Sequence, residues 1–211
     1  MVEDSDKSSC IAILGGTFNP IHKGHILLAR HALEFDKEIK HVYLMPNNKP
    51  AYKCSSDIET NENRCNMIEI ATKDIENISL STIEIDRGGT TYTVDTLEYL
   101  NNKFQGININ FIIGDDSLLN FKKWVNYPRI LELCNLIVAR RIYDYSRLKL
   151  FSDDIISKLG YGKISIMECP IFDASSSDIR NALQNGINPV GLDENVFEYI
   201  KTHKLYGWCE H

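Results

Sequence analysis

The chain has 211 residues, 43% of them hydrophobic and 25% charged, which is typical of a globular protein long enough to form a sizeable core. Its formal net charge of -6 argues against a general nucleic-acid binder, because such domains carry a basic face. No apolar run approaches the ~20 residues that span a bilayer, and the polar first residues lack a signal-peptide core. We therefore expect a cytosolic protein without a membrane partner.

The cysteines are scattered along the chain and form no Cys-x-x-Cys pair, so the sequence predicts neither a zinc site nor a thioredoxin-like motif. With no secretory segment, we expect reduced thiols rather than disulfides. Cys10 and Cys134 stand within apolar stretches, where a free cysteine packs as a small hydrophobic side chain. We expect both in the core.

Residues 1–9 are polar and acidic, and we expect them to be a disordered lead before one domain at residues 10–211. Residues 10–14 form an apolar run that predicts a buried strand, and apolar side chains at helical spacing follow from residue 26 to about residue 35. Between them, Gly15 and Gly16 make a turn whose missing side chains let a phosphate approach the backbone. The next helix start offers unpaired N–H groups and a positive dipole end to an anion. Open parallel sheets bind ligands at such a junction.

Two histidines stand just after this turn. His22 and His25 are three residues apart, so they share a face of a helix near its start. A double glycine after a strand is common, and two histidines can simply cap or pack, so neither feature alone indicates a phosphate site. Their combination with Thr17 and Pro20 in one stretch, GGTFNPIHKGH, favours such a site.

The rest of the chain alternates predicted strands and helices. We expect strands at residues 41–45, 78–85, 107–113, 133–139 and 163–167. We expect helices at residues 61–73, 93–104, 155–159, 175–183 and 194–201. Thr93 can cap one of them, and Ser175 or its neighbours can cap another. The alternation predicts an α/β fold with a doubly wound parallel sheet and helices on both faces.

Polar residues follow several of these strands. Lys53 stands in a polar loop past the second strand, on the same side as the glycine turn. A surface lysine is usually only solvated, but this position makes a phosphate role an equally good interpretation. Gly114 and Asp116 follow the strand at residues 107–113 in the same way. Trp124, taken alone, would more often be a packing anchor than a ligand platform.

The stretch GGTFNPIHKGH resembles the GxFDPxHxGH signature of the nucleotidyltransferases related to class I tRNA synthetases, with Asn19 in place of the usual aspartate. Four further stretches resemble the bacterial-type nicotinate mononucleotide adenylyltransferases, at residues 45–53, 91–97, 111–124 and 175–180. The last is similar to an ISSTxIR signature, with Ala174 and Ser177 in place of isoleucine and threonine. The likeness covers essentially the whole chain after residue 9. The histidine motif identifies only the superfamily, and the segments at 91–97 and 111–124 narrow it.

This resemblance implies a Rossmann-like single domain that transfers AMP from ATP to nicotinate mononucleotide. The products would be deamido-NAD and pyrophosphate, formed by direct in-line attack without a covalent intermediate. A phosphate monoester, whose second pKa is about 6, needs no general base to act as the nucleophile. The enzyme must instead hold two anions together and neutralise charge at the α-phosphate. Mg²⁺ would bridge the ATP phosphates with few protein ligands and no separate metal site.

The resemblance also implies a role for each residue of the site. The catalytic residues would be His22, His25 and Arg180. The ATP-binding residues would be Gly15, Gly16, Thr17, Lys53, Gly114, Asp116 and Ser176. The residues that bind nicotinate mononucleotide would be Asn47, Thr93, Trp124 and Val125. In this group Trp124 would stack on the pyridine ring, and backbone N–H groups near Thr93 and Val125 would bind the carboxylate.

Two other interpretations stay open. Pantetheine-phosphate adenylyltransferases and cytidylyltransferases share the histidine motif, although they lack this Tyr-Thr segment and the spacing to Trp124. A non-catalytic nucleotide sensor or partner-binding module could use the same fold. Intact His22, His25 and Arg180 argue against it, because a pure binder need not keep the phosphate-binding groups. The sequence leaves the oligomeric state open, including a homodimer.

Overall fold

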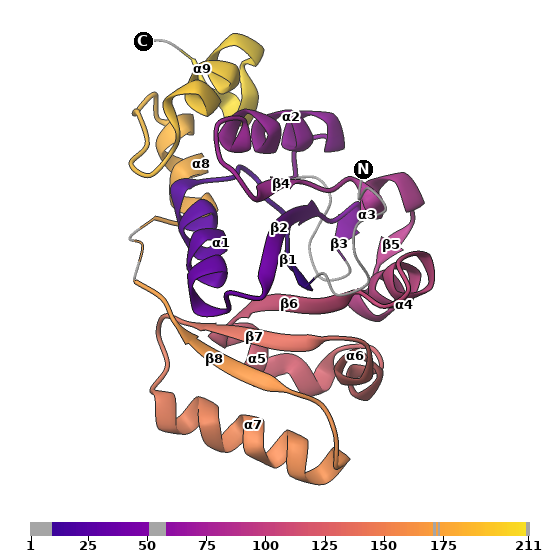
Figure 1. Ribbon diagram of the computed structural model, residues 1–211. Helices are drawn as coiled ribbons and strands as arrows, with labels where there is room; N and C mark the ends of the chain where they lie inside the picture. Colours follow the sequence, from indigo (N-terminus) through magenta and orange to yellow (C-terminus); the bar gives the residue numbers. More distant parts are fainter. Residues whose placement is uncertain (1–9, 51–57, 171, 173, 210–211) are drawn as a thin grey trace.

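A computed structural model describes residues 10–50, 58–170, 172 and 174–209. Its main element is a six-stranded sheet with the order β4-β2-β1-β6-β7-β8, in which every neighbouring pair is parallel (Figure 1). The strands are β1 (Cys10–Gly16), β2 (Ile39–Pro46), β4 (Ile78–Leu80), β6 (Asn108–Gly114), β7 (Asn135–Arg140) and β8 (Ile164–Glu168). The predicted doubly wound α/β fold is confirmed. The disordered lead at 1–9 lies outside the described residues, and a single domain stays a prediction.

Helices cover both faces of this sheet. They are α1 (Lys23–Phe35), α2 (Asn61–Thr72), α3 (Ile83–Arg87), α4 (Thr93–Lys103), α5 (Asp115–Asn120), α6 (Tyr127–Leu133), α7 (Tyr145–Leu159), α8 (Ser176–Gln184) and α9 (Glu194–His203). Short 3-10 helices follow α5 and α9, at η2 (Phe121–Lys123) and η3 (Leu205–Gly207). A second, two-stranded parallel sheet joins β3 (Lys49–Pro50) to β5 (Thr90–Thr91). None of the described helices is long and apolar enough to cross a membrane.

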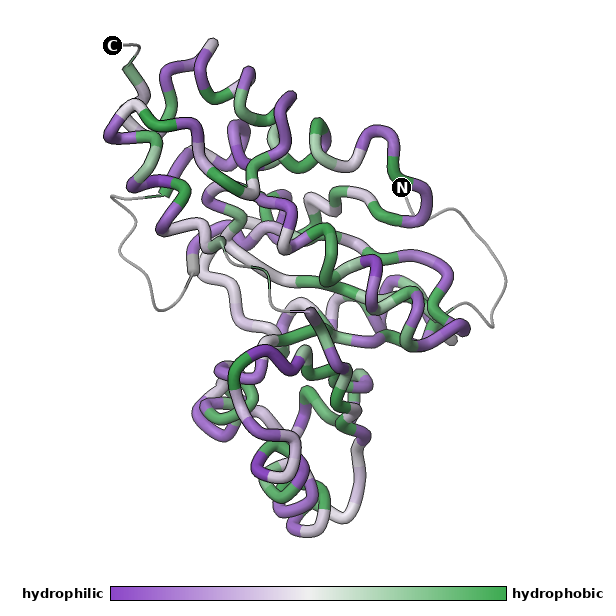
Figure 2. The backbone as a smooth tube through the Cα atoms, turned by 90° about the vertical axis from the view of Figure 1, so that its left-hand side faces the viewer, coloured by the Kyte–Doolittle hydropathy of each residue, from purple (hydrophilic) through white to green (hydrophobic). Residues whose placement is uncertain are grey.

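The strands supply two hydrophobic cores, because successive side chains of a strand point to opposite faces. In β1, Cys10, Ala12 and Leu14 pack with α1, α2, α8 and α9. Ile11 and Ile13 pack on the other face, with α4, α5, α6 and α7. The surrounding helices alternate hydrophobic and hydrophilic residues along their turns, as Figure 2 shows. Cys10 and Cys134 are buried, as predicted.

The middle of the sheet is a topological switch point. Strand β1 lies between β2 and β6, so the chain winds outward in one direction through β2 and β4 and in the other through β6, β7 and β8. Ligands of doubly wound sheets bind beyond the carboxyl ends of the strands at this point. Here those ends are Gly16 and Gly114, and the glycine turn of the sequence motif therefore opens onto the switch point.

Several local predictions were wrong. The strand expected at 133–139 begins at Asn135 because Leu133 ends α6, and the helix expected at 155–159 begins at Tyr145. The strand expected at 78–85 ends at Leu80, and the chain turns into α3 because Glu84 enters the interior and accepts a hydrogen bond from Thr96 Oγ1 at 2.7 Å. Thr93 is the first residue of α4 rather than its cap, since Tyr92 holds the N-cap position without a side-chain hydrogen bond. The Ser175 cap is confirmed: its Oγ accepts from the N–H of Asp178 in a capping box.

Candidate active site

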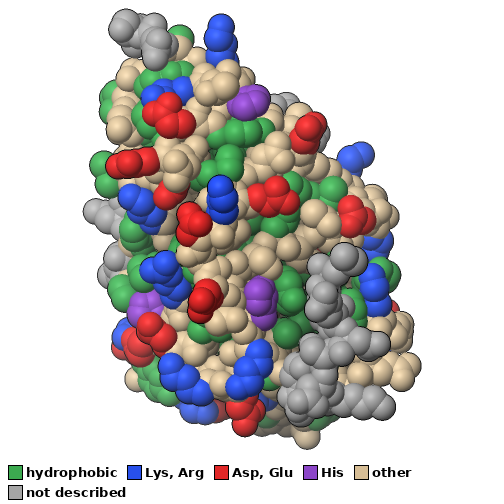
Figure 3. Space-filling model, turned by 45° about the horizontal axis from the view of Figure 1, so that its top comes forward, with side chains coloured by type: hydrophobic (Ala, Val, Ile, Leu, Met, Phe, Trp, Pro, Cys, Tyr) green, Lys and Arg blue, Asp and Glu red, His purple; other side chains and the backbone are tan. Residues whose placement is uncertain are grey.

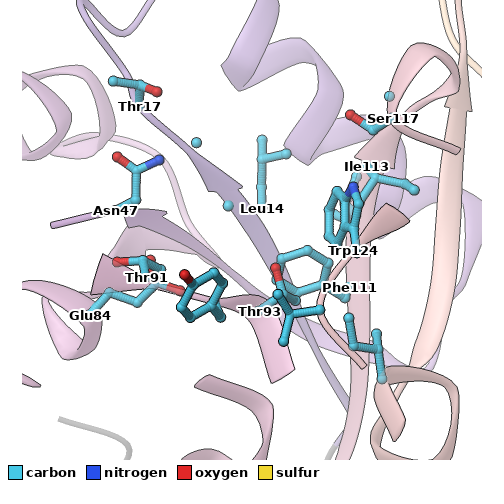
Figure 4. Close-up of a pocket in the computed structure, with 17 residues that line it drawn as sticks. Leu14, Thr17, Asn47, Glu84, Thr91, Thr93, Phe111, Ile113, Ser117 and Trp124 are labelled. Carbon is cyan, nitrogen blue, oxygen red and sulfur yellow. The ribbon is translucent and has the colours of Figure 1, made fainter. Parts of the chain in front are cut away.

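A cavity of about 430 Å³ opens beyond the carboxyl ends of β1 and β6. Figure 4 shows Trp124, Ile113 and Phe111 on one side of it and Asn47, Thr91 and Glu84 on the other. The predicted site residues that line it are Gly15, Gly16, Thr17 and Gly114 from the ATP group, and Asn47, Thr93, Trp124 and Val125 from the acceptor group. The fold thus brings both predicted groups to one space of a size suited to a small ligand.

Gly114 allows a close approach at the end of β6. A Cβ atom at this position would lie 2.5 Å from Arg141 Nη2 and 2.5 Å from Asp116 Oδ1. Those two groups form an ion pair of 3.2 Å across the open end of the strand. Asp116 therefore contacts Arg141 beside the cavity and does not line it.

The neighbouring Asp115 has a structural function that the sequence reasoning missed. Its buried carboxylate accepts hydrogen bonds from the backbone N–H groups of Arg141, Ile142 and Tyr143, at 2.7–3.0 Å. Those bonds, with one from the N–H of Asp116, outweigh burial and lower the pKa of Asp115. The loop after β7 is thus attached to the end of β6, and this holds Arg141 near the site.

One end of the cavity combines a helix start with an aromatic ring. Tyr92 and Thr93 line it where α4 begins, and no side chain caps this helix. The first N–H groups of a helix have no partner within the helix and form the positive end of its dipole. The ring of Trp124 also lines this end and packs against Phe121, with ring centroids 5.5 Å apart. A helix start beside the Trp124 ring suits a ligand with a planar ring that carries a negative substituent.

The two motif histidines form a capping box at the start of α1. Nδ1 of His22 accepts from the N–H of Gly24 at 3.1 Å, and Nδ1 of His25 accepts from the N–H of His22 at 3.2 Å. The ring centroids lie 3.8 Å apart, and His25 meets the edge of Phe18 at 4.9 Å. Because both Nδ1 atoms are acceptors, each neutral ring carries its proton on Nε2.

The charge state of His22 follows from its surroundings. Burial, together with the positive charge of Arg141, lowers the pKa of His22 from 6.5 to about 4. Phe172 stacks parallel to the ring at 6.1 Å. His22 is therefore a neutral N–H donor at neutral pH, which can bind a phosphate oxygen without contributing a formal charge.

The start of α8 docks on the motif loop. Ser176 Oγ donates to the carbonyl of Pro20 at 2.9 Å, and Arg180 Nη1 donates to the carbonyl of Asn19 at 2.8 Å. Arg180 does not line the 430 Å³ cavity but lines a neighbouring polar hollow of about 530 Å³ with Glu59 and Lys204. None of the predicted catalytic residues His22, His25 and Arg180 lines the 430 Å³ cavity. His22 lines a separate hollow of about 350 Å³ with Ile21 and Phe172, and Arg180 is joined to the motif loop through Asn19.

Asn19 stands where the resembling signature has aspartate, and its amide oxygen works as an acceptor. Oδ1 accepts from the N–H of Glu59 at 3.0 Å and from the hydroxyl of Tyr206 at 3.0 Å. Burial raises the pKa of Tyr206, and this keeps the hydroxyl protonated as a donor. A carboxylate would accept the same two bonds, which explains why the neutral residue is compatible with the loop.

Glu84 is a cavity residue that the sequence reasoning missed. Burial raises the pKa of its carboxyl to about 7, although the hydrogen bond from Thr96 and the charge of Arg87 both act in the opposite direction. Arg87 Nη2 in turn donates to Thr96 Oγ1 at 2.9 Å, forming a chain from Arg87 through Thr96 to Glu84. A signal was present in the sequence, because Ser81 and Thr82 are consecutive polar residues that break the strand alternation shortly before Glu84.

Lys53 lies outside the described residues. Within the described part of the chain, no group of three or more His, Cys, Asp or Glu side chains is placed to hold a metal ion. On the face seen in Figure 3, basic and acidic side chains are interspersed rather than gathered by sign.

Comparison with known proteins gives the same assignment as the motifs. The cytidylyltransferase-like family profile matches residues 13–182. The chain is 37% identical over 201 residues to a probable nicotinate-nucleotide adenylyltransferase of Borrelia turicatae, covering 93% of this chain and 97% of the relative. It is 33% identical over 204 residues to a probable nicotinate-nucleotide adenylyltransferase of Lactococcus lactis, covering 96% of this chain and 98% of the relative.

The fold is also similar to solved structures. A Plasmodium falciparum nicotinic acid mononucleotide adenylyltransferase complexed with NaAD superposes with a TM-score of 0.77 at 18% identity, covering 95% of this chain and 98% of that one. The same protein complexed with APC gives a TM-score of 0.76 at 19% identity, with the same coverage. At these identities the likeness concerns the fold. With the near full-length sequence relatives, the motif loop and the switch-point cavity, this chain belongs to the nicotinate-nucleotide adenylyltransferases of the cytidylyltransferase-like family.

Proposed function

We propose that this nicotinate-nucleotide adenylyltransferase joins its two substrates across the switch-point cavity. A phosphate oxygen of nicotinate mononucleotide attacks the α-phosphorus of ATP, the bond to the bridging oxygen breaks, and pyrophosphate leaves with that oxygen. The nucleophile is already largely ionised near neutral pH, so the protein needs no base. Its contribution is to hold the reactants in line and to stabilise charge on the α-phosphate.

ATP occupies the motif side in this proposal. Gly15, Gly16 and Thr17 bring backbone close to the nucleotide at the end of β1. His22 and His25 donate from Nε2 to phosphate oxygens, since both Nδ1 atoms are used in the cap. Ser176, Arg180 and the start of α8 bind the β- and γ-phosphates beside the same loop, a position supported by their contacts with Pro20 and Asn19. Gly114 faces the adenosine with Asp116 beside it, and Lys53 stays a predicted ATP-binding residue.

Nicotinate mononucleotide occupies the α4 side. The observation that carries this assignment is the Trp124 ring lining the same cavity wall as the uncapped start of α4 at Thr93. The pyridinium ring stacks on the indole, and its carboxylate accepts from backbone N–H groups near Thr93 and Val125. Asn47 Oδ1 is buried without a hydrogen-bond partner among the described residues, so a ribose hydroxyl of the acceptor would satisfy it.

Mg²⁺ enters with ATP as part of the substrate in this scheme. In this proposal the metal is held chiefly by phosphate oxygens and water. The Nε2 donors of the histidines, the charge of Arg180 and the helix starts then supply the remaining stabilisation of the phosphates.

The test is pyrophosphate release from the purified protein with MgATP and each candidate acceptor. We expect nicotinate mononucleotide to be favoured over its amide by at least about a hundredfold in kcat/KM, because an amide leaves a buried donor unpaired. A ratio near one, or one favouring the amide, would contradict the acceptor site. Release with phosphopantetheine, or with CTP in place of ATP, would favour another member of the superfamily. No release with any pair would contradict the activity itself.

A further inference from the structure

Arg64 is an arginine that neither the motif nor the proposed reaction uses. It is the largest fully buried side chain among the described residues, with 0% of its surface exposed. It begins the buried stripe of α2 that continues through Met67 and Ile68. A buried arginine is costly unless its donors are satisfied, so its partners indicate what it does.

Its guanidinium bonds to four neutral acceptors. Nε donates to the carbonyl of Glu59 at 3.2 Å, and Nη1 donates to the carbonyl of Thr17 at 2.7 Å. Nη2 donates to the carbonyl of Asn47 at 2.7 Å and to Oδ1 of Asn61 at 2.5 Å. Within the described part of the chain no carboxylate pairs with it.

Two of these acceptors belong to neighbouring segments on the same side of the cavity (Figure 4). Thr17 follows β1 and is among the predicted ATP-binding residues, whereas Asn47 follows β2 and is among the predicted acceptor-binding residues, and both line the cavity. Nη1 and Nη2 are held in one rigid plane, so their two bonds fix the separation of the two carbonyls. The N–H of Asn47 also donates to the carbonyl of Gly16 at 3.0 Å, which joins the same two segments a second time.

We propose, given the function above, that Arg64 is a positioning residue for adenylyl transfer: its planar guanidinium fixes the placement of the ATP-binding segment at Thr17 relative to the neighbouring acceptor-binding segment at Asn47. It touches neither reactant. It acts by keeping the attacking oxygen and the α-phosphorus at reacting distance, where a displacement of about 1 Å costs about a hundredfold in rate. Its buried charge also raises the positive potential behind the phosphate loop, since only dipoles offset it.

The test compares Arg64→Lys with Arg129→Lys. Lysine keeps the charge but lacks the planar fork, so it cannot hold both carbonyls at a fixed separation. We expect kcat of Arg64→Lys to fall by about a hundredfold, while KM for each substrate stays within about fivefold. Arg129 pairs with Glu98 and Glu132 on the surface, and its lysine variant should keep wild-type kcat. Assays run well below each variant's Tm, with folding checked by circular dichroism.

A folded Arg64→Lys protein with kcat within about threefold of wild type would overturn the proposal, because a purely structural residue would lower Tm without changing turnover. If lysine prevents folding, Arg64→Met removes the buried charge and serves as the second variant, with the same expected loss of kcat. If neither variant folds, Arg64 is required by the fold and the positioning role is overturned. An inactive wild-type protein would instead contradict the proposed function, so the two failures are distinguishable.

Discussion

His22 and His25 cap the same helix start through their Nδ1 atoms, one accepting from Gly24 and the other from the backbone of His22 itself. The three-residue spacing is therefore explained by local structure before any ligand is considered. Capping and phosphate binding are compatible, because the cap uses Nδ1 and leaves the proton on Nε2. The capping box thus fixes both the orientation and the tautomer of two proposed phosphate donors.

Replacing His25 by asparagine should separate these two functions. The amide oxygen of asparagine stands close to the position of Nδ1 and keeps the cap, whereas the Nε2 donor is lost. We expect kcat to fall by about a hundredfold, as for loss of one charge-stabilising donor, with Tm nearly unchanged. His31→Ala, two turns along α1, is the control for changes in the helix. Near-normal turnover in folded His25→Asn protein would remove His25 from the catalytic group.

The protonation of His22 can be followed directly by NMR. With its pKa lowered to about 4, the His22 ring resonance should stay unchanged as the pH falls from about 8 to 5.5. The folded protein resists protonation more than the unfolded chain, so the free energy of unfolding should decrease as pH falls from 6.5 through about 4. The His22 resonance is assigned as the one that is missing from the spectrum of the His22→Asn variant. A midpoint near 6.5 would contradict the buried, neutral ring.

Trp124→Ala should weaken acceptor binding selectively. Loss of the stacking surface should raise KM for nicotinate mononucleotide by roughly tenfold or more, while the Kd of ATP stays within about threefold. Trp124→Phe keeps an aromatic ring against Phe121 and should recover much of the affinity. Equal effects of the alanine variant on both substrates would indicate a packing residue instead.

Glu84→Gln should remove a pH dependence from acceptor binding. The Glu84 carboxyl, with a pKa of about 7, becomes a carboxylate on the cavity wall as the pH rises, and it then repels an anionic acceptor. The ratio of acceptor KM, wild type over variant, should increase severalfold between about pH 6 and 8. The acceptor phosphate ionises equally in both assays, so dividing by the KM of the variant removes its effect. A constant ratio would show that Glu84 does not sense the acceptor.

The same carboxyl affects stability with a definite sign. Its pKa is raised from 4.5 to about 7 on folding, so the folded protein binds this proton more tightly than the unfolded chain. The free energy of unfolding should therefore decrease as pH rises from about 4.5 through about 7, and Glu84→Gln should lack this contribution. Urea unfolding of both proteins at pH 5 and about pH 8 measures the difference.

Tyr206→Phe should loosen the motif loop. The hydrogen bond from the Tyr206 hydroxyl to Asn19 Oδ1 is lost, whereas the bond from the N–H of Glu59 remains. We expect Tm to fall by a few degrees and KM for ATP to rise severalfold, with acceptor KM little changed. Tyr161→Phe on the α7–β8 connection is the matched control. An unchanged ATP KM would mean that the loop holds its shape without this contact.

Sequence reasoning located most of the long elements because their periodicity is strong, although it predicted only residues 155–159 of α7 (Tyr145–Leu159). The run at 10–14 and the alternate packing of β1 needed no tertiary information. The short helices were missed: α5 and α6 are too brief for a periodic signal, and α3 depends on the burial of Glu84 against Thr96. These elements are stabilised by contacts between distant segments, which a local pattern does not contain.

The candidate site likewise contains residues that a local sequence pattern predicts and residues whose contacts it does not reveal. Gly15, Gly16 and the histidines were predicted from a contiguous motif, and their arrangement at the end of β1 follows from the strand–turn–helix order. Arg64 had a visible signal, because its spacing to Met67 and Ile68 puts it on the buried stripe of α2. Its partners at Thr17 and Asn47 could not be inferred, since both are backbone carbonyls brought near by the sheet.

The contact between Tyr206 and Asn19 has a consequence for how the protein is made. Their hydrogen bond spans 187 positions of the chain, and Arg180 reaches the same residue across 161. The motif loop is synthesised well before Arg180 and Tyr206, the groups that contact it. A nascent chain therefore exposes the motif loop without these contacts until the turn at Leu205–Gly207 docks. In the proposed mechanism, nucleotide affinity should accordingly appear in one step once Tyr206 has been synthesised, rather than growing with chain length.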